Sequence, residues 1–176
     1  MEKPIKSIAT NYGLYLGAIL ALISVTAYAV NLDLYTKWWF GIAILILIII
    51  VGIVSTSKAK TALNGVISFK EAFTAYFITV LIGLVISAVM SIIIFNVIDP
   101  EAALVLKEKV IDTQVEMMRS FGAPEEAVAE AVEKMEAQSN MYSIGNVLQS
   151  IVFQLIGFSI VGLIVALVMK KGHENA

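Results

Sequence analysis

Four long stretches of the chain contain no Asp, Glu, Lys or Arg and are mostly apolar. They cover Ser7–Leu32, Trp38–Ser57, Ala72–Ile98 and Ala137–Met169. A hydrocarbon core of about 30 Å is crossed by about 20 helical residues, so each stretch is long enough to span a bilayer. We therefore predict an all-α, integral membrane four-helix bundle forming a single domain over residues 1–176, with crossings at about 12–30, 38–57, 72–97 and 146–169.

Residues 99–138 break this pattern and predict an amphipathic helical hairpin outside the membrane, between crossings three and four. Asp99, Pro100 and Glu101 favour a helix start, with a capping side chain, a proline in the first turn and an acid near the positive helix end. Gly122 favours its end, and Pro124 the start of a second helix. The first helix has one predicted apolar face, formed by Leu104, Ile111, Val115, Met118 and Phe121.

Small residues recur at four-residue intervals in two of the predicted crossings. Such stripes let two backbones approach closely, and van der Waals packing then holds the helices together in lipid. We expect crossings one and three to be direct neighbours, whereas the aliphatic second crossing should be the most exposed to lipid. The predicted helix-packing residues are Gly13, Gly17 and Ala21 in crossing one, and Gly83, Ser87 and Ser91 in crossing three.

The third crossing is preceded by a capping-box pattern. The Ser68 hydroxyl can accept a hydrogen bond from the amide of Glu71, and the Glu71 carboxylate can reach back to the amide of Ser68. We expect both residues to have this structural role.

Basic residues near the ends of the crossings predict the orientation. Seven lysines lie on the side that holds both termini, against Lys37 in the first turn on the other side. The positive-inside rule then places both termini in the cytoplasm and residues 99–143 outside. The first apolar run also resembles a secretion signal that ends at Ala27-Tyr28-Ala29, but the early start of the second crossing at Trp38 favours a retained helix.

Composition narrows the classes of function. The 176 residues are 59% hydrophobic and 15% charged, the net charge is −2, and basic residues form no patch, so nucleic acid is not an expected partner. The chain has no cysteine, which excludes disulfides, thiolate metal sites and a cysteine nucleophile. No catalytic constellation, cofactor motif or metal motif is present in the sequence. We expect a protein that is not an enzyme and has neither cofactor nor bound metal.

Acidic residues dominate the predicted hairpin, with ten acids and four bases between Asp99 and Glu136, a local net charge of −6. Glu108, Asp112 and Glu116 are spaced by four residues and share one helix face. The face is interpreted first as a solvated surface, with weak cation or partner binding as the alternative. Within the crossings, polar residues usually join helices, and a polar path lined by Ser24, Ser87 and Gln154 is the alternative.

Several local sequences resemble an uncharacterised bacterial family, domain of unknown function 4199. The resemblance rests on Lys3-Pro4-Ile5 with Asn11-Tyr12-Gly13, the turn from Asn31 to Trp39, Ser68 to Phe73 followed by Tyr76-Phe77, and Asn96 to Pro100. It spans nearly the whole chain, and the run from Ser68 to Phe73 is its most specific part. It implies a small four-helix protein of the inner membrane of Gram-negative bacteria. With the orientation predicted from the lysines, residues 99–143 then lie in the periplasm. The resemblance implies no activity.

The preferred hypothesis is a structural or protein-interaction role in which the bilayer holds the crossings and the acidic hairpin is displayed to another membrane or periplasmic protein. The alternative is a small transporter or channel, or a subunit of one, that works as a homo-oligomer. The sequence identifies no substrate and no specific partner.

Overall fold

The computed structural model describes residues 2–137 and 140–171, and within these ranges the chain is helical, with no β-strand. Two elements differ from α-helices: η1 is a 3-10 helix and η2 is a π-helix that continues α3. The order is α1 (Glu2–Val30), η1 (Leu32–Thr36), α2 (Trp38–Ala62), α3 (Phe69–Ile92), η2 (Ile93–Ile98), α4 (Pro100–Ser120), α5 (Glu125–Glu136) and α6 (Ile144–Met169).

Four helical segments are long and apolar enough to cross a membrane, and they indicate a multi-pass membrane protein. They are Pro4–Val30, Trp38–Ala62, Phe69–Ile98 and Ile144–Met169. The helix of the second crossing continues past its first lysine to Ala62, five residues beyond the predicted end at 57. Lysine and alanine are good helix formers, so the charges that end an apolar run do not end the helix.

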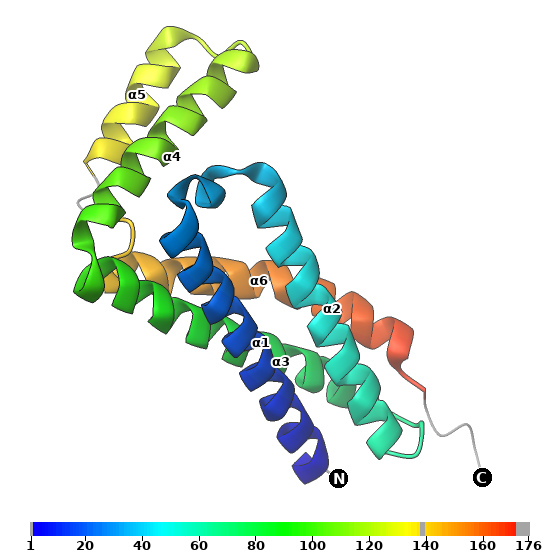
Figure 1. The fold of residues 1–176 in the computed structure, drawn as a ribbon. Coiled ribbons are helices and arrows are strands. Elements are labelled where there is room, and N and C mark those ends of the chain that lie inside the picture. Colours follow the sequence, from blue (N-terminus) through cyan, green and yellow to red (C-terminus); the bar gives the residue numbers. More distant parts are fainter. Residues whose placement is uncertain (1, 138–139, 172–176) are drawn as a thin grey trace.

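Helix α3 is central to the packing of these segments (Figure 1). Its most extensive contact is with α1, and it also packs against α2 and α6. The main apolar cluster takes residues from all four helices: Leu16, Leu20, Ile48, Tyr76, Val80, Leu84 and Val165. Helix α6 is the least covered by the rest of the protein: 17% of its apolar segment is buried, compared with 22% for α2. The prediction that the second crossing is the most exposed is therefore wrong, because α6 packs on α3 and has only a small contact with α2.

Tyr76 of α3 lies in a slot between two glycines of neighbouring helices. A Cβ atom on Gly52 of α2 would come within 2.5 Å of the Tyr76 ring, and one on Gly162 of α6 within 2.7 Å. The ring is fully buried. The two glycines thus let an aromatic side chain fill the space where three helices meet.

Helices α4 and α5 lie side by side beyond one end of the spanning helices (Figure 1). We name residues 99–136 the acidic arm. Its two helices are joined by a tight turn in which Gly122 has a φ of 76°, a conformation that favours glycine.

The base of the arm packs on η1 and η2 and buries Ala102, Ala103 and Leu106. The predicted apolar face of α4 is wrong at its two ends, because Leu104 is 55% exposed and Phe121 is 84% exposed. The base of α4 packs on the bundle through a different side of the helix from the one that faces α5.

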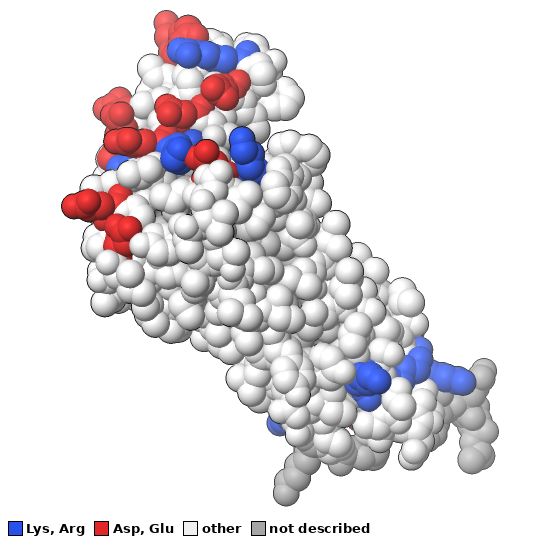
Figure 2. All heavy atoms as spheres, in the orientation of Figure 1, with Lys and Arg blue, Asp and Glu red and all other residues white. Residues whose placement is uncertain are grey.

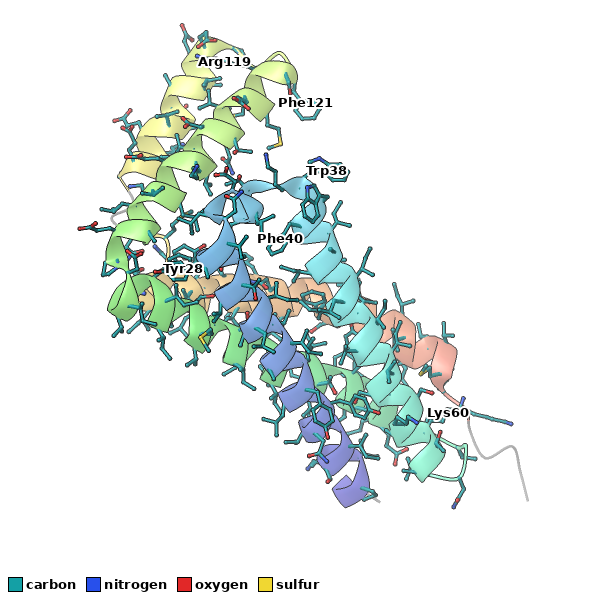
Figure 3. The ribbon with its side chains drawn as sticks, in the orientation of Figure 1. Tyr28, Trp38, Phe40, Lys60, Arg119 and Phe121 are labelled. Carbon is teal, nitrogen blue, oxygen red and sulfur yellow. The ribbon has the colours of Figure 1, made fainter. Side chains whose placement is uncertain are left out.

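Charged side chains separate to the two ends of the molecule, as Figure 2 shows. The acids gather on the arm, and the opposite end carries lysines, including Lys60 at the end of α2 (Figure 3). The apolar surface between them has the length of the spanning helices. The lysine-rich end is the end that carries the excess of lysines from which the orientation in the membrane was predicted.

Candidate functional site

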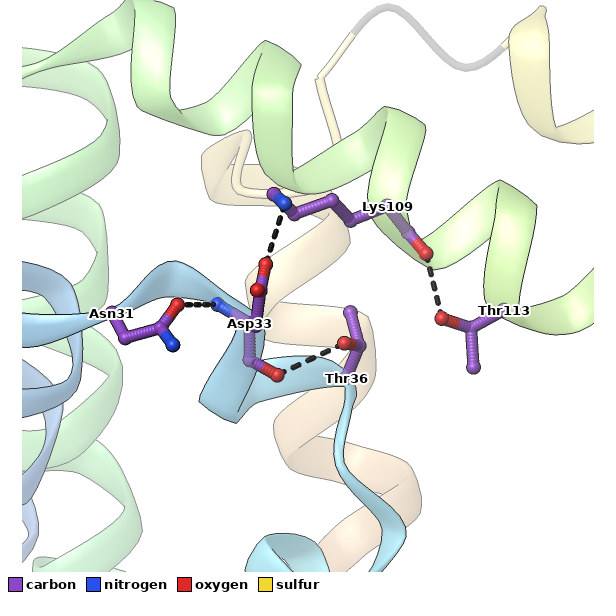
Figure 4. A network of polar contacts seen from close by, with 5 residues as sticks. All are labelled: Asn31, Asp33, Thr36, Lys109 and Thr113. Atoms are coloured by element: carbon purple, nitrogen blue, oxygen red, sulfur yellow. Dashed lines mark hydrogen bonds and ion pairs between the residues drawn. The ribbon is translucent and has the colours of Figure 1, made fainter.

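The acidic arm is tied to the bundle by several long-range polar contacts among the described residues. The first contact is an ion pair between the Lys109 ammonium of α4 and the Asp33 carboxylate of η1 (Figure 4). Asp33 is held in place locally, because its amide donates to Asn31 Oδ1 at 2.8 Å and its carbonyl accepts from Thr36 Oγ1 at 2.9 Å. The hydrogen bond and charge of Lys109 lower the pKa of the Asp33 carboxyl.

The second contact places Asp99 between the arm and the end of α1. Asp99 caps α4, with Oδ1 accepting from the amide of Ala102 at 2.9 Å, and Oδ2 accepts from Tyr28 Oη at 2.9 Å. The Ala102 amide and then the Tyr28 hydroxyl stabilise the carboxylate and lower the pKa of Asp99. One side chain therefore both starts the arm and ties it to the first spanning helix.

The third contact is an asparagine network at the foot of the arm. Asn96 of η2 donates through Nδ2 to the Tyr142 carbonyl at 2.7 Å, and its Oδ1 accepts from Asn140 Nδ2 at 3.0 Å. Asn146 Nδ2 donates to the Asn140 carbonyl at 2.7 Å. The network joins the end of α3 to the start of α6, so the chain leaves and re-enters the spanning region at adjacent points.

Aromatic rings fill the space beneath this network. Phe95 stacks on Tyr142 with ring centroids 4.1 Å apart, and Tyr28 and Tyr35 meet Phe95 edge to face. Burial raises the pKa of the Tyr142 phenol, which stays neutral. The Tyr35 hydroxyl donates to the Ser24 carbonyl at 2.9 Å. The junction is thus a packed polar and aromatic layer.

The outer surface of the arm presents solvated carboxylates. Glu108, Asp112 and Glu116 are exposed, and within the described part of the chain none of the three forms an ion pair. Among the described residues no group of three or more His, Cys, Asp or Glu side chains has the geometry of a metal site. The arrangement offers a negative surface suited to attracting a positively charged partner.

The predicted helix-packing residues fall into two groups. The glycines lie in the contact between α1 and α3. An added Cβ would come within 2.7 Å of Ile82 at Gly13, within 2.5 Å of Ile86 at Gly17 and within 2.5 Å of Leu16 at Gly83. Ala21 is buried. Ser87 and Ser91 instead line a groove against α6. Each four-residue step rotates a stripe by about 40° around the helix, which turns the later positions away from α1.

The capping pair lies at the opposite end of the bundle. Ser68 Oγ accepts from the Glu71 amide at 3.3 Å, and Glu71 Oε2 accepts from the Ser68 amide at 2.9 Å. The two side chains therefore cap α3.

The groove between α3 and α6 brings together two of the three residues of the polar path considered in the sequence. Its volume is about 220 Å³, and its polar lining consists of Ser87, Ser91, Ser150 and Gln154, with Ser24 outside the lining. Sequence reasoning did not identify Ser150 or the asparagine network. Asparagines next to the ends of two apolar runs are the signal that could have identified the network, since such residues need a hydrogen-bond partner at a helix end.

Comparison with known proteins adds a family and no activity. No curated protein matches the chain, and no solved structure matches it. The sequence model of a family described as "Protein of unknown function (DUF4199)" matches residues 11–171, and the chain belongs to this family.

Proposed function

We propose that this protein is a non-enzymatic interaction protein of the bacterial inner membrane that presents the acidic arm, on the periplasmic side, to another protein. The observation that carries the proposal is the position of the arm: it lies beyond the spanning helices, and a phenylalanine at its tip is 84% exposed. The spanning helices anchor the arm, and the arm supplies the binding surface.

The tip of the arm combines apolar and charged groups. Phe121 and Arg119 both lie at the tip of the arm (Figure 3), and Met117, one turn before Phe121, is 51% exposed. Burying a large aromatic side chain is favourable, so an aromatic residue that is exposed in the free protein would gain free energy when a partner covers it. Phe121 and Met117 are therefore the anchors that we assign to partner contact.

The charges of the arm favour a basic partner. With a net charge of −6 over residues 99–136, the arm attracts cationic surfaces over about 8 Å at physiological ionic strength. Such charges mainly raise the association rate, while buried aromatic contacts provide most of the affinity. We expect binding that weakens with salt and is abolished by loss of the aromatic anchor.

The orientation follows from the lysines at the other end. The ends of α2, α3 and α6 that lie opposite the arm (Figure 1) carry Lys58, Lys60, Lys70 and Lys170. Because cytoplasmic segments are enriched in lysine and arginine, this end belongs in the cytoplasm and the arm outside.

Site-specific photocrosslinking in native membranes tests the role. A photoreactive residue at Phe121 should yield a discrete adduct with one protein, whereas a photoreactive residue at Trp38, an exposed aromatic position outside the arm, is the matched control. High salt should reduce the Phe121 adduct if a basic surface is bound. Adducts with lipid alone, or equal adducts from both positions, would refute the proposal.

Accessibility to a membrane-impermeant maleimide tests the orientation independently. The chain has no cysteine, so single substitutions provide unique thiols. Gln114→Cys in the arm should react in cells whose outer membrane has been permeabilised, while Ser57→Cys should react only after the inner membrane is opened. The opposite pattern would place the arm in the cytoplasm.

A further inference from the structure

The groove between α3 and α6 contains uncharged polar groups that lack partners. Among the described residues, the side chains of Ser87, Ser150 and Gln154 make no hydrogen bond, while Ser91 Oγ donates to the Ser87 carbonyl at 3.1 Å. The rest of the lining is mostly apolar and includes Leu84, Ala88, Val147 and Ile151. The groove therefore has unused donors and acceptors in an apolar surround.

These groups lie at membrane depth. Helix α6 starts at Ile144, so Ser150 and Gln154 are about 9 and 15 Å along its axis at 1.5 Å per residue. Both distances fall inside a hydrocarbon core of about 30 Å. Lipid chains cannot hydrogen-bond to an amide or hydroxyl, so these side chains are stabilised by a polar partner that enters the groove.

The narrower groove taken alone is small for a free ligand. Its volume of about 220 Å³ is below the range of about 300 to 1,000 Å³ typical of small-molecule sites. A more open groove adjoins it, sharing Ser150 and Tyr142 and adding Gln149 and Asn146. Helix α6, the least covered spanning helix, therefore has an exposed polar strip along it. The strip consists of Gln149, Ser150 and Gln154.

We propose that a second copy of this chain packs on this strip, with the α6 helices of the two copies facing each other across a two-fold axis. Each amide and hydroxyl in the strip both donates and accepts, and none is charged, so the strip is complementary to itself. A two-fold interface brings the same patch of each copy together. Gly157, where an added Cβ would meet nothing within 4 Å, lets the two backbones approach.

Disulfide crosslinking tests the proposal in native membranes. Ser150→Cys should give a crosslinked dimer upon mild oxidation, because Cα atoms about 5.5 to 6 Å apart can form a disulfide. Ile50→Cys, also at an exposed position but on α2, is the control and should remain monomeric. Equal crosslinking from both positions indicates random collision and would overturn the proposal, as would a Ser150→Cys chain that never crosslinks.

Dimer affinity of the full chain in lipid bilayers provides a second readout. Single-molecule photobleaching should show dimers, and the Gln149→Leu and Gln154→Leu double variant should weaken dimerisation by about tenfold or more, given the usual strength of interhelical hydrogen bonds. Both side chains are exposed, and circular dichroism verifies that the helices persist. Gln114→Leu in the arm is the matched control and should dimerise normally. A monomeric wild-type chain, or a double variant with unchanged affinity, would refute the proposal.

Discussion

Lys109 on the acidic arm forms an ion pair with Asp33 in the turn between α1 and α2, so a segment near residue 110 is tied to one near residue 33. Two further contacts reinforce this attachment: the hydrogen bond from Tyr28 to Asp99 and the asparagine network around Asn96. The arm is thus held by an ion pair, a charge-assisted hydrogen bond and neutral amide contacts. These three kinds of contact respond differently to pH and to mutation.

Removing the ion pair should loosen the arm and leave the bundle intact. In Asp33→Asn the charge of Lys109 loses its partner, while the packing of Leu106 at the base of the arm remains. Spin labels at Ala129→Cys and Ser57→Cys should give a broader distance distribution in this variant by pulsed electron resonance. Glu125→Gln, which breaks the Arg119 ion pair within the arm, is the control and should leave the distribution unchanged.

Acid should have the same effect on the wild-type chain. The pKa of Asp33 lies below its ordinary value of 3.8 because of Lys109, and the pKa of Asp99 is lowered chiefly by the Ala102 amide. A carboxyl with a lowered pKa stabilises the folded form above its ordinary pKa, and the contribution is lost as the pH falls through the lowered value. The same spin-label pair should therefore report an unchanged arm from pH 7 to 5 and a loosened arm below about pH 4. An arm that loosens between pH 7 and 5 would contradict this assignment.

The asparagine network should contribute to the stability of the whole fold. Asn96→Leu removes one donor and one acceptor and leaves the Tyr142 carbonyl and the Asn140 amide without their partner. An unsatisfied polar group costs about 1 to 3 kcal/mol when it is fully buried, and these groups are half-buried, so we expect a cost at the lower end of this range and a lower midpoint of thermal unfolding in detergent. Gln114→Leu, an exposed substitution in the arm, should leave the midpoint unchanged. Equal midpoints for the two variants would show that the network is not stabilising.

Two glycines of the same helix should respond oppositely to alanine. Gly52→Ala places a methyl group within 2.5 Å of the Tyr76 ring, and overpacking of this kind destabilises by about 1 to 3 kcal/mol. Gly41→Ala, where nothing lies within 4 Å, should be neutral or stabilise α2 by up to about 1 kcal/mol. Thermal unfolding of both variants measures the difference. A tolerated Gly52→Ala would mean that Tyr76 can move out of its slot.

The class of fold was predictable from the sequence because runs of uncharged apolar residues are governed by the thickness of a bilayer. The contacts of Gly13, Gly17 and Gly83 between α1 and α3 were predictable from the four-residue spacing of small residues, which is also a local signal. The positions of Ser87 and Leu104 were not predictable in this way, because each depends on which neighbour lies beside the helix at that point. The periodicity of a sequence predicts which face of a helix is apolar, but it does not predict which neighbouring helix packs on that face.

The candidate site was predictable only in its charge. The acidic character of residues 99–136 is evident from composition, whereas its attachment through Tyr28, Asp33 and Asn96 joins segments separated by up to 76 residues. Those pairings depend on how the crossings are arranged, and sequence spacing contains no information about them. The helical spacing also placed Phe121 on the apolar face of α4, but α4 ends at Ser120 and Phe121 is exposed in the turn.

The continuity of α3 with η2 has a mechanical consequence. The arm begins directly after this helix, at Asp99, and α3 has the most extensive contacts with the other spanning helices. A force applied to the arm would therefore be transmitted through α3 to the other spanning helices. Tyr76 of α3, held between Gly52 and Gly162, would resist sliding of α3 along its neighbours.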